Sequence, residues 1–349
     1  MARIKVDEIT NLAENGNVSF PSGGASFSGN VSVGGSVTAD SVNASIALKN
    51  FTDAELPSSG NTVGTLIWNT DSQEVQVWDG SAWVKLNNPY KDVDATSVEA
   101  FWDGAADQVS GNVWFSKRQH PNVSHANCTM INNPVYSPSV PGGDGSIGFW
   151  NFNGSSQYGW INDLNYSNGG SHGPNNNGQL ANFTMGIWFR TTYGTPSTGG
   201  GWDSGNWSWL DWDRSEVVSW NIGTAGKLQF SGYANTGGYW DITGDRTYND
   251  GQWHFGICTV SADNNQVIFY GDGTIDGTRS VNHSYFGART RRWGFIGDGS
   301  EAGSNNSTRN QVYYDGDIAQ LFLINEVWDA TKVLTHYNKT KGRFGLSLK

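Results

Sequence analysis

Short runs of apolar and β-branched residues, each closed by a cluster of Gly, Asn or Asp, dominate the chain from residue 95 to residue 345. The runs recur at the roughly 8–12-residue spacing that is typical of β-sandwiches and barrels. Residues 183–190 are apolar at their odd positions, which indicates a strand. Residues 318–324 are almost wholly apolar, as in a strand covered on both faces. The pattern predicts an antiparallel sandwich.

Composition supports the same fold class. Charged residues make up 15% of the chain, whereas about 25% is usual. Gly, Asn, Ser, Thr and Trp are in excess, and they favour strands and turns over helices. One helix is expected, after the N-cap Asp329 and before Gly342. Its apolar face would consist of Ala330, Val333, Leu334 and Tyr337. We therefore predict an all-β fold with one short C-terminal helix.

Three zones differ in composition. Residues 1–49 have few large apolar groups, too few to offset an ordering entropy of about 1–2 kcal/mol per residue. This zone is therefore either disordered or an extended anchor and stalk that packs on copies of itself or on a larger assembly. Residues 50–92 alternate strand and turn signals and predict a small β-meander that carries Trp68, Trp78 and Trp83. Residues 93–349 form the sandwich domain.

Charge and hydropathy exclude several classes of protein. The net charge of −11 repels phosphate backbones, so no nucleic acid partner is expected. No apolar run reaches the roughly 18 residues that a membrane-spanning helix needs, and residues 1–17 lack the apolar core of a signal peptide. Cys128 and Cys258 are too few for a disulfide framework or a zinc site. We expect buried thiols, with a bridge as the alternative.

The third zone, residues 93–349, resembles the laminin-G-like, concanavalin-A-like jelly rolls along almost its whole length, because five segments match that family in the right order. These segments are residues 132–158, the strand 183–189, the Asp-Gly-x-Trp-His turn at 250–254, the Tyr-x-Asp-Gly hairpin at 270–273 and the closing strand 314–321. The resemblance implies a jelly-roll sandwich. It also implies a rim that binds calcium in some members.

Residues 2–12, 64–69 and 79–86 are similar to segments of structural proteins from tailed bacteriophages, particularly those that infect marine cyanobacteria. This resemblance implies a virion fibre, spike or decoration, assembled in the host cytoplasm and placed on the virion surface. Residues 1–49 would then contact other virion proteins, and the chain would form a homo-oligomer, with a trimer expected for a fibre.

Catalytic groups are not evident. A retaining glycan hydrolase needs two carboxylates about 5 Å apart, and no strand carries such a cluster. Glu326 and Asp329 come nearest, but Asp329 already has a capping task. His254 belongs to the turn motif and is expected to be a hydrogen-bonded structural histidine. We predict that the protein is not an enzyme.

Binding is better supported. Residues 199–213 place aromatic rings beside carboxylates and amides, which is the chemistry that recognises the faces and hydroxyls of sugars. Trp209 or Trp212 should be buried, so the candidate ligand-binding residues are Trp202, Asp203 and Trp207. The alternative is that these rings only pack in the fold or at an interface.

No cofactor is expected, but one metal is considered. Asp298 lies in a glycine-rich, oxygen-rich loop that could hold calcium; the alternative is an ordinary Asp-Gly turn. Residues 289–293 contain three arginines that would meet an acidic neighbour or an anionic glycan, or else form a solvated rim.

Together these features predict a tail-fibre or spike protein that anchors by its N-terminus and presents a lectin-like jelly roll to host surface glycans. A capsid-decorating protein without a ligand and a glycan depolymerase are the alternatives.

Overall fold

The computed structural model describes residues 48–57, 59–70, 74–78, 80, 83–85, 98–118, 126–166, 178–193, 207–213 and 215–346. The chain divides into two compact units, residues 1–87 and 88–349. The predicted boundary between an anchor and the meander at residue 49 stays a prediction, because residues 1–47 lie outside the described residues.

The first unit is a small sheet. Its strands, in spatial order, are β1 (Asn50–Phe51), β2 (Leu66–Asn69), β3 (Glu74–Trp78) and β4 (Trp83–Lys85), and a 3-10 turn η1 spans Asp53–Glu55. Strands β2, β3 and β4 pair antiparallel, which confirms the predicted meander, and β1 adds to it parallel to β2. Trp68, Trp78 and Trp83 are all half-buried. A sheet this small covers only part of each ring.

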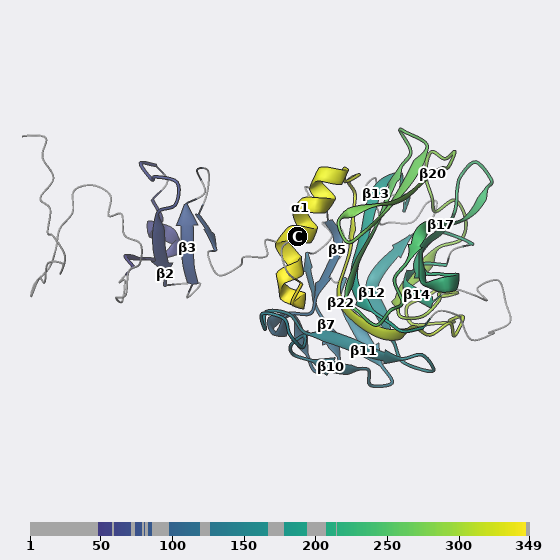
Figure 1. The fold of residues 1–349 in the computed structure, drawn as a ribbon, viewed down its shortest axis with the longest axis horizontal. Coiled ribbons are helices and arrows are strands. Elements are labelled where there is room, and N and C mark those ends of the chain that lie inside the picture. Colours follow the sequence, from purple (N-terminus) through teal and green to yellow (C-terminus); the bar gives the residue numbers. More distant parts are fainter. Residues whose placement is uncertain are drawn as a thin grey trace, which may run out of the picture. The chain divides into compact units, whose positions relative to one another are not determined.

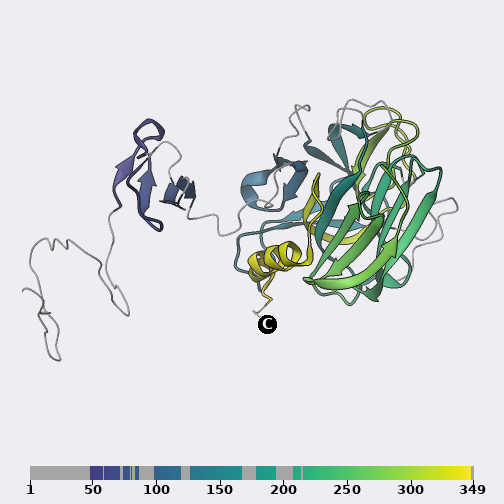
Figure 2. The ribbon, with the colours of Figure 1, turned by 90° about the horizontal axis from the view of Figure 1, so that it is seen from above.

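The second unit is a sandwich of two antiparallel sheets (Figures 1 and 2). We call them the helix-side sheet and the far sheet. The helix-side sheet runs in the order β10 (Val135–Ser137), β11 (Phe149–Asn153), β22 (Asp315–Ile324), β13 (Asn182–Arg190), β18 (His254–Ser261), β19 (Gln266–Gly271) and β20 (Thr274–Ser280), with β5 (Val98–Asp103) also paired to β22 and β8 (Ser116–Arg118) to β5.

The far sheet completes the sandwich. It runs in the order β17 (Tyr239–Thr247), β16 (Lys227–Tyr233), β15 (Val218–Ile222), β14 (Trp207–Asp211), β21 (Arg292–Ile296), β12 (Tyr158–Tyr166), β9 (Cys128–Ile131), β7 (Val113–Trp114) and β6 (Val109–Ser110). The turns η2 (Ala106–Gln108) and η3 (Thr224–Gly226) connect strands. The predicted all-β jelly-roll sandwich is confirmed.

The main core lies between the two sheets. Met185, Ile187 and Phe189 of β13 point inward. The centroid of the Phe189 ring lies 4.3 Å from that of the Trp209 ring on β14. Cys128 and Cys258 are free and buried in this core, which confirms the prediction of buried thiols. Burial raises the pKa of both thiols well above its usual value, so they remain protonated and unreactive.

A second apolar layer covers the outer face of the helix-side sheet. Helix α1 (Ala330–Thr340) and the turn η4 (Lys341–Phe344) lie across it beside β5 and β22 (Figure 1). Trp188 of β13 points outward, stacks on Phe344 at 4.0 Å between ring centroids, and donates from Nε1 to Thr340 Oγ1 at 3.0 Å. No described helix is long and apolar enough to cross a membrane.

The helix begins where the sequence predicts but buries a different face. Asp329 caps it, because its side chain accepts a hydrogen bond from Lys332 N at 2.8 Å. Val333 and Tyr337 are buried as expected, whereas Leu334 is 44% exposed. Gly342 does not end the helical segment, since η4 continues to Phe344 and Gly345 takes the left-handed conformation with φ of 72°.

A buried ion pair fixes this cover to the sheet. Arg343 of η4 donates to both carboxylate oxygens of Asp103 on β5, at 2.6 and 2.8 Å, and Gln320 of β22 donates to the same carboxylate at 3.1 Å. Burial by itself would raise the pKa of Asp103, but the hydrogen bonds and charge of Arg343 outweigh it and lower the pKa to about 2. The carboxylate is therefore ionised and fully paired.

We expect Arg343→Ala to lower the free energy of unfolding by about 3–5 kcal/mol, because it leaves the Asp103 charge buried without its partner. Urea denaturation measures the change. The control is Arg279→Ala, which removes an ion pair with the 65%-exposed side chain of Asp245 and should cost only about 0–1 kcal/mol. Equal losses for the two variants would contradict the assignment of Asp103–Arg343 as the attachment of the cover.

Candidate functional site

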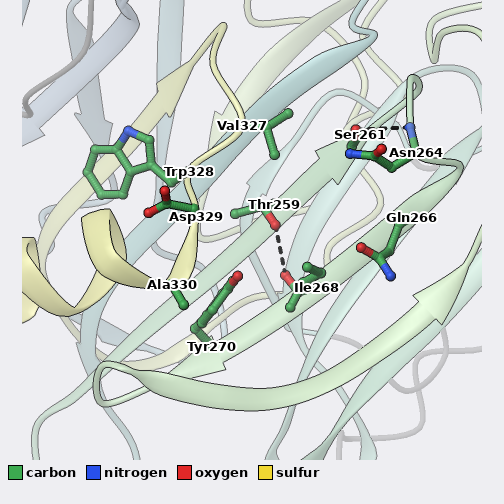
Figure 3. A pocket seen from close by; sticks show the side chains of 10 residues that line it. All are labelled: Thr259, Ser261, Asn264, Gln266, Ile268, Tyr270, Val327, Trp328, Asp329 and Ala330. Carbon is green, nitrogen blue, oxygen red and sulfur yellow. Dashed lines mark hydrogen bonds between the residues drawn. The ribbon is translucent and has the colours of Figure 1, made fainter.

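The cover of the helix-side sheet stops short at one end, where a pocket of about 360 Å³ opens (Figure 3). Its floor is the outer face of β18 and β19, and its wall is the turn that leads from β22 into α1. The pocket is lined by Thr259, Ser261, Asn264, Gln266, Ile268, Tyr270, Val327, Trp328, Asp329 and Ala330.

Strand alternation directs the floor residues into the pocket. Cys258 and Val260 of β18 belong to the inner core, as do Val267 and Phe269 of β19, so the residues between them point outward. In the antiparallel register Thr259 lies opposite Ile268, and Ser261 lies opposite Gln266. These paired positions place two hydroxyls and an amide side by side on the pocket floor.

The polar groups of the pocket differ in whether they already have a hydrogen-bond partner. Thr259 Oγ1 donates to the backbone oxygen of Ile268 at 3.5 Å, and Ser261 Oγ accepts from Asn264 N at 3.2 Å (Figure 3). By contrast, the side-chain amides of Asn264 and Gln266 and the hydroxyl of Tyr270 make no hydrogen bond with any described residue. A hydroxylated ligand would supply the missing partners.

Asp329 provides the single carboxylate of the lining. One of its oxygens caps α1 by accepting from Lys332 N, and the other has no partner among the described residues. Burial, and then the charge of Asp329, raise the pKa of Tyr270 above its usual value. The Tyr270 hydroxyl therefore keeps its proton at neutral pH and can both donate and accept.

This lining can bind a polar molecule but lacks paired carboxylates. A retaining glycosidase needs two carboxyl groups about 5 Å apart, and an inverting one needs two at roughly 6.5–9.5 Å. Asp329 is the one acidic residue among the ten lining residues. The Tyr270 ring is itself 2% exposed and so contributes its hydroxyl rather than a stacking face.

Of the three candidate ligand-binding residues, the structure describes only Trp207. Trp202 and Asp203 lie outside the described residues, and Trp207 is the first residue of β14, in the far sheet. Their assignment as ligand-binding residues stays a prediction. Trp209 and Trp212 are fully buried, as the sequence indicated.

Asp298 lies two residues after the end of β21 and is fully buried, with nitrogen donors around its carboxylate. Its Oδ1 accepts from Gly299 N at 2.8 Å and Val312 N at 2.9 Å, and Arg309 Nη1 lies 3.3 Å from Oδ2. Burial raises the pKa of this carboxyl to about 6, against the lowering by these donors. Among the described residues no group of three His, Cys, Asp or Glu side chains could hold a metal. Of the two alternatives that the sequence offers for Asp298, calcium and an ordinary turn, these contacts favour the turn, and calcium binding itself remains to be tested.

We expect millimolar calcium to leave the melting temperature unchanged, because Arg309 places a positive charge beside Asp298 and calcium requires 6–8 oxygen ligands. Differential scanning calorimetry with calcium and with a chelator measures this. A calcium-dependent rise in melting temperature that Asp298→Asn abolishes would instead establish the metal site.

The basic run and the turn histidine have structural partners. Arg292 contacts Asp213 at 2.9 Å and Glu301 at 3.2 Å. Exposed Arg289 lies 3.9 Å from the centroid of the Tyr233 ring. His254 lies between two carboxylates, with Nδ1 at 2.9 Å from Asp272 and Nε2 at 2.9 Å from Asp250. The prediction of a hydrogen-bonded structural histidine agrees with these contacts.

Protonation of His254 should stabilise the fold. Burial opposes the charged form, but the hydrogen bonds and charges of Asp272 and Asp250 outweigh it and raise the pKa of His254. The contribution is therefore complete below the unfolded value of about 6.5 and is lost as the pH rises through the higher folded value. We expect the stability advantage over His254→Gln to shrink as the pH rises from about 5.5 to 8.5. Denaturant titrations at each pH measure this advantage. An advantage that grows with pH would contradict the stabilising role of the contacts that His254 makes with Asp272 and Asp250.

The pocket is not evident from the sequence. Its residues are ordinary strand and turn types, whereas aromatic residues beside carboxylates and amides are the more specific signal of a glycan site. One signal was present: along β18 the outward positions change from Phe255 and Ile257 to Thr259 and Ser261. This change marks where the apolar cover ends.

No protein-family model matches the sequence, and no curated protein matches it. Similar solved structures include the botulinum neurotoxin serotype D binding domain, with 9% identity and a TM-score of 0.45 over 69% of this chain and 51% of that one. The binding domain of botulinum neurotoxin DC in complex with SialylT has 11% identity and a TM-score of 0.47 over 70% and 51%. This chain spans about half of their length. These similarities are too low to transfer a function or a residue role.

Proposed function

We propose that this chain is a virion surface protein of the tail-fibre or spike type, whose jelly roll holds host surface glycans without cleaving them. The observation that carries the binding role is the pocket with unpartnered groups on Gln266, Tyr270 and Asp329 and a single carboxylate. The virion setting is supported by the resemblance of residues 2–12 and 64–86 to segments of tailed-phage structural proteins.

The pocket suits a single sugar unit. Its volume of 360 Å³ lies at the lower end of the roughly 300–1,000 Å³ range of ligand pockets. A net gain of about 0.5–1.5 kcal/mol for each hydrogen bond gives only weak affinity for one site. Many copies, as in a trimeric fibre anchored to other virion proteins through residues 1–49, would convert weak binding into avidity.

Tyr270→Phe and Gln266→Ala should each weaken glycan binding by roughly 2–10-fold, because each removes one hydrogen bond with little change to the fold. A glycan array identifies ligands, and titration calorimetry on the best one measures the affinities. The matched control is Asn305→Ala, at an exposed residue outside the pocket, which should bind as the wild type does.

The rival functions give different results. Release of reducing ends from a bound polysaccharide would establish a depolymerase and overturn the proposal. An array without ligands, together with a cryo-EM map that places the chain on the capsid shell, would establish a decorating protein. Location at a tail tip or collar, with the copy number of a fibre, supports adhesion.

A further inference from the structure

The charges around the pocket bear on the kind of glycan that it accepts. Asp329 contributes a negative charge, Tyr270 stays neutral, and none of the ten lining residues is Lys or Arg. From these charges we propose that the pocket selects neutral glycans and rejects those that carry sulfate, sialate or uronate groups. This inference rests on the proposed glycan-binding function and deepens it.

Lys332 lies two residues beyond Ala330, the last residue of the pocket wall, and it is already engaged. Its Nζ pairs with Glu326 and lies 5.9 Å from the centroid of the Trp328 ring. Its charge is therefore neutralised by the chain itself. An anionic group in the pocket would find no Lys or Arg to pair with among the ten lining residues.

The helix terminus does not reverse this preference. The positive end of a helix macrodipole usually favours an anion, and the pocket lies against the first turn of α1. Here Asp329 already fills that role, because its carboxylate accepts from Lys332 N. A second anion would lie next to the Asp329 charge, and the two would repel.

Neutral hydroxyls match the free groups. A ligand hydroxyl can donate to the unpartnered oxygen of Asp329, and other hydroxyls of the same ligand can accept from Tyr270 or from the Gln266 amide. A carboxylate or sulfate group can only accept hydrogen bonds, so it cannot donate one to Asp329. The same lining therefore favours hydroxyl groups and disfavours an anionic group.

Asp329→Asn tests the inference without removing the helix cap, because Asn caps a helix about as well as Asp. The probes are an array of neutral oligosaccharides paired with their singly sulfated counterparts. For the best-bound pair, we expect the wild type to favour the neutral member by at least about tenfold at low salt. Asp329→Asn should bring this ratio close to one, mainly by improving binding of the sulfated member.

Three measurements separate an effect of charge on binding from an effect on the fold. Asp107→Asn makes the same change of charge at an exposed residue of η2, outside the pocket, and should keep the wild-type ratio. Thermal unfolding should show equal stability for wild type and Asp329→Asn. Raising the salt concentration should also reduce the wild-type discrimination, because it screens the repulsion.

The outcomes distinguish this inference from the function on which it rests. A wild-type preference for the sulfated members, or a ratio that Asp329→Asn leaves unchanged, would overturn the selection while Tyr270→Phe still shows that the pocket binds glycans. Absence of binding to every neutral and sulfated glycan would overturn both.

Discussion

The helix-side sheet has apolar side chains on both faces, so the sandwich needs a second cover in addition to the far sheet. Strand β22, at the centre of this sheet, is buried along eight consecutive positions. Its inward side chains meet the far sheet, and its outward ones, such as Phe322, meet α1 and η4. Each large side chain buried in this way stabilises the fold by about 1.5–3 kcal/mol. The C-terminal residues are therefore part of the core.

The extent of this cover determines where a ligand can reach the sheet. Beneath α1 and η4 the outward side chains are large and apolar, including Trp188, Phe255 and Ile257. Beyond the start of the helix they become Thr259 and Ser261 on β18 and Gln266 on β19. Thr259 and Ser261 are themselves buried, and each makes a hydrogen bond with the backbone. A buried hydroxyl without such a partner would be costly. The edge of the apolar cover is therefore also the edge of the pocket.

Much of the fold could be predicted from local sequence patterns. The strands around residues 149–153, 183–190, 266–270 and 318–324 and the cap at Asp329 were expected and are present. The buried face of α1 was predicted only in part, because Leu334 fits the apolar periodicity but is exposed. Periodicity identifies the apolar positions of a helix, whereas the angle at which the helix crosses the sheet decides which of them are covered. The continuation into η4 depends on Arg343 and Phe344, whose partners Asp103 and Trp188 are distant in sequence.

The site was less predictable, for a physical reason that Asp329 illustrates. The sequence predicts that this residue caps the helix, and on that ground it was set aside as a catalytic carboxylate. A carboxylate has two oxygens, however, and the cap uses one of them. Whether the second oxygen faces solvent, a partner or a pocket depends on β18 and β19, which are distant in the chain but adjacent in space. A structural task at one atom of a side chain therefore does not exclude the binding task that we propose for another.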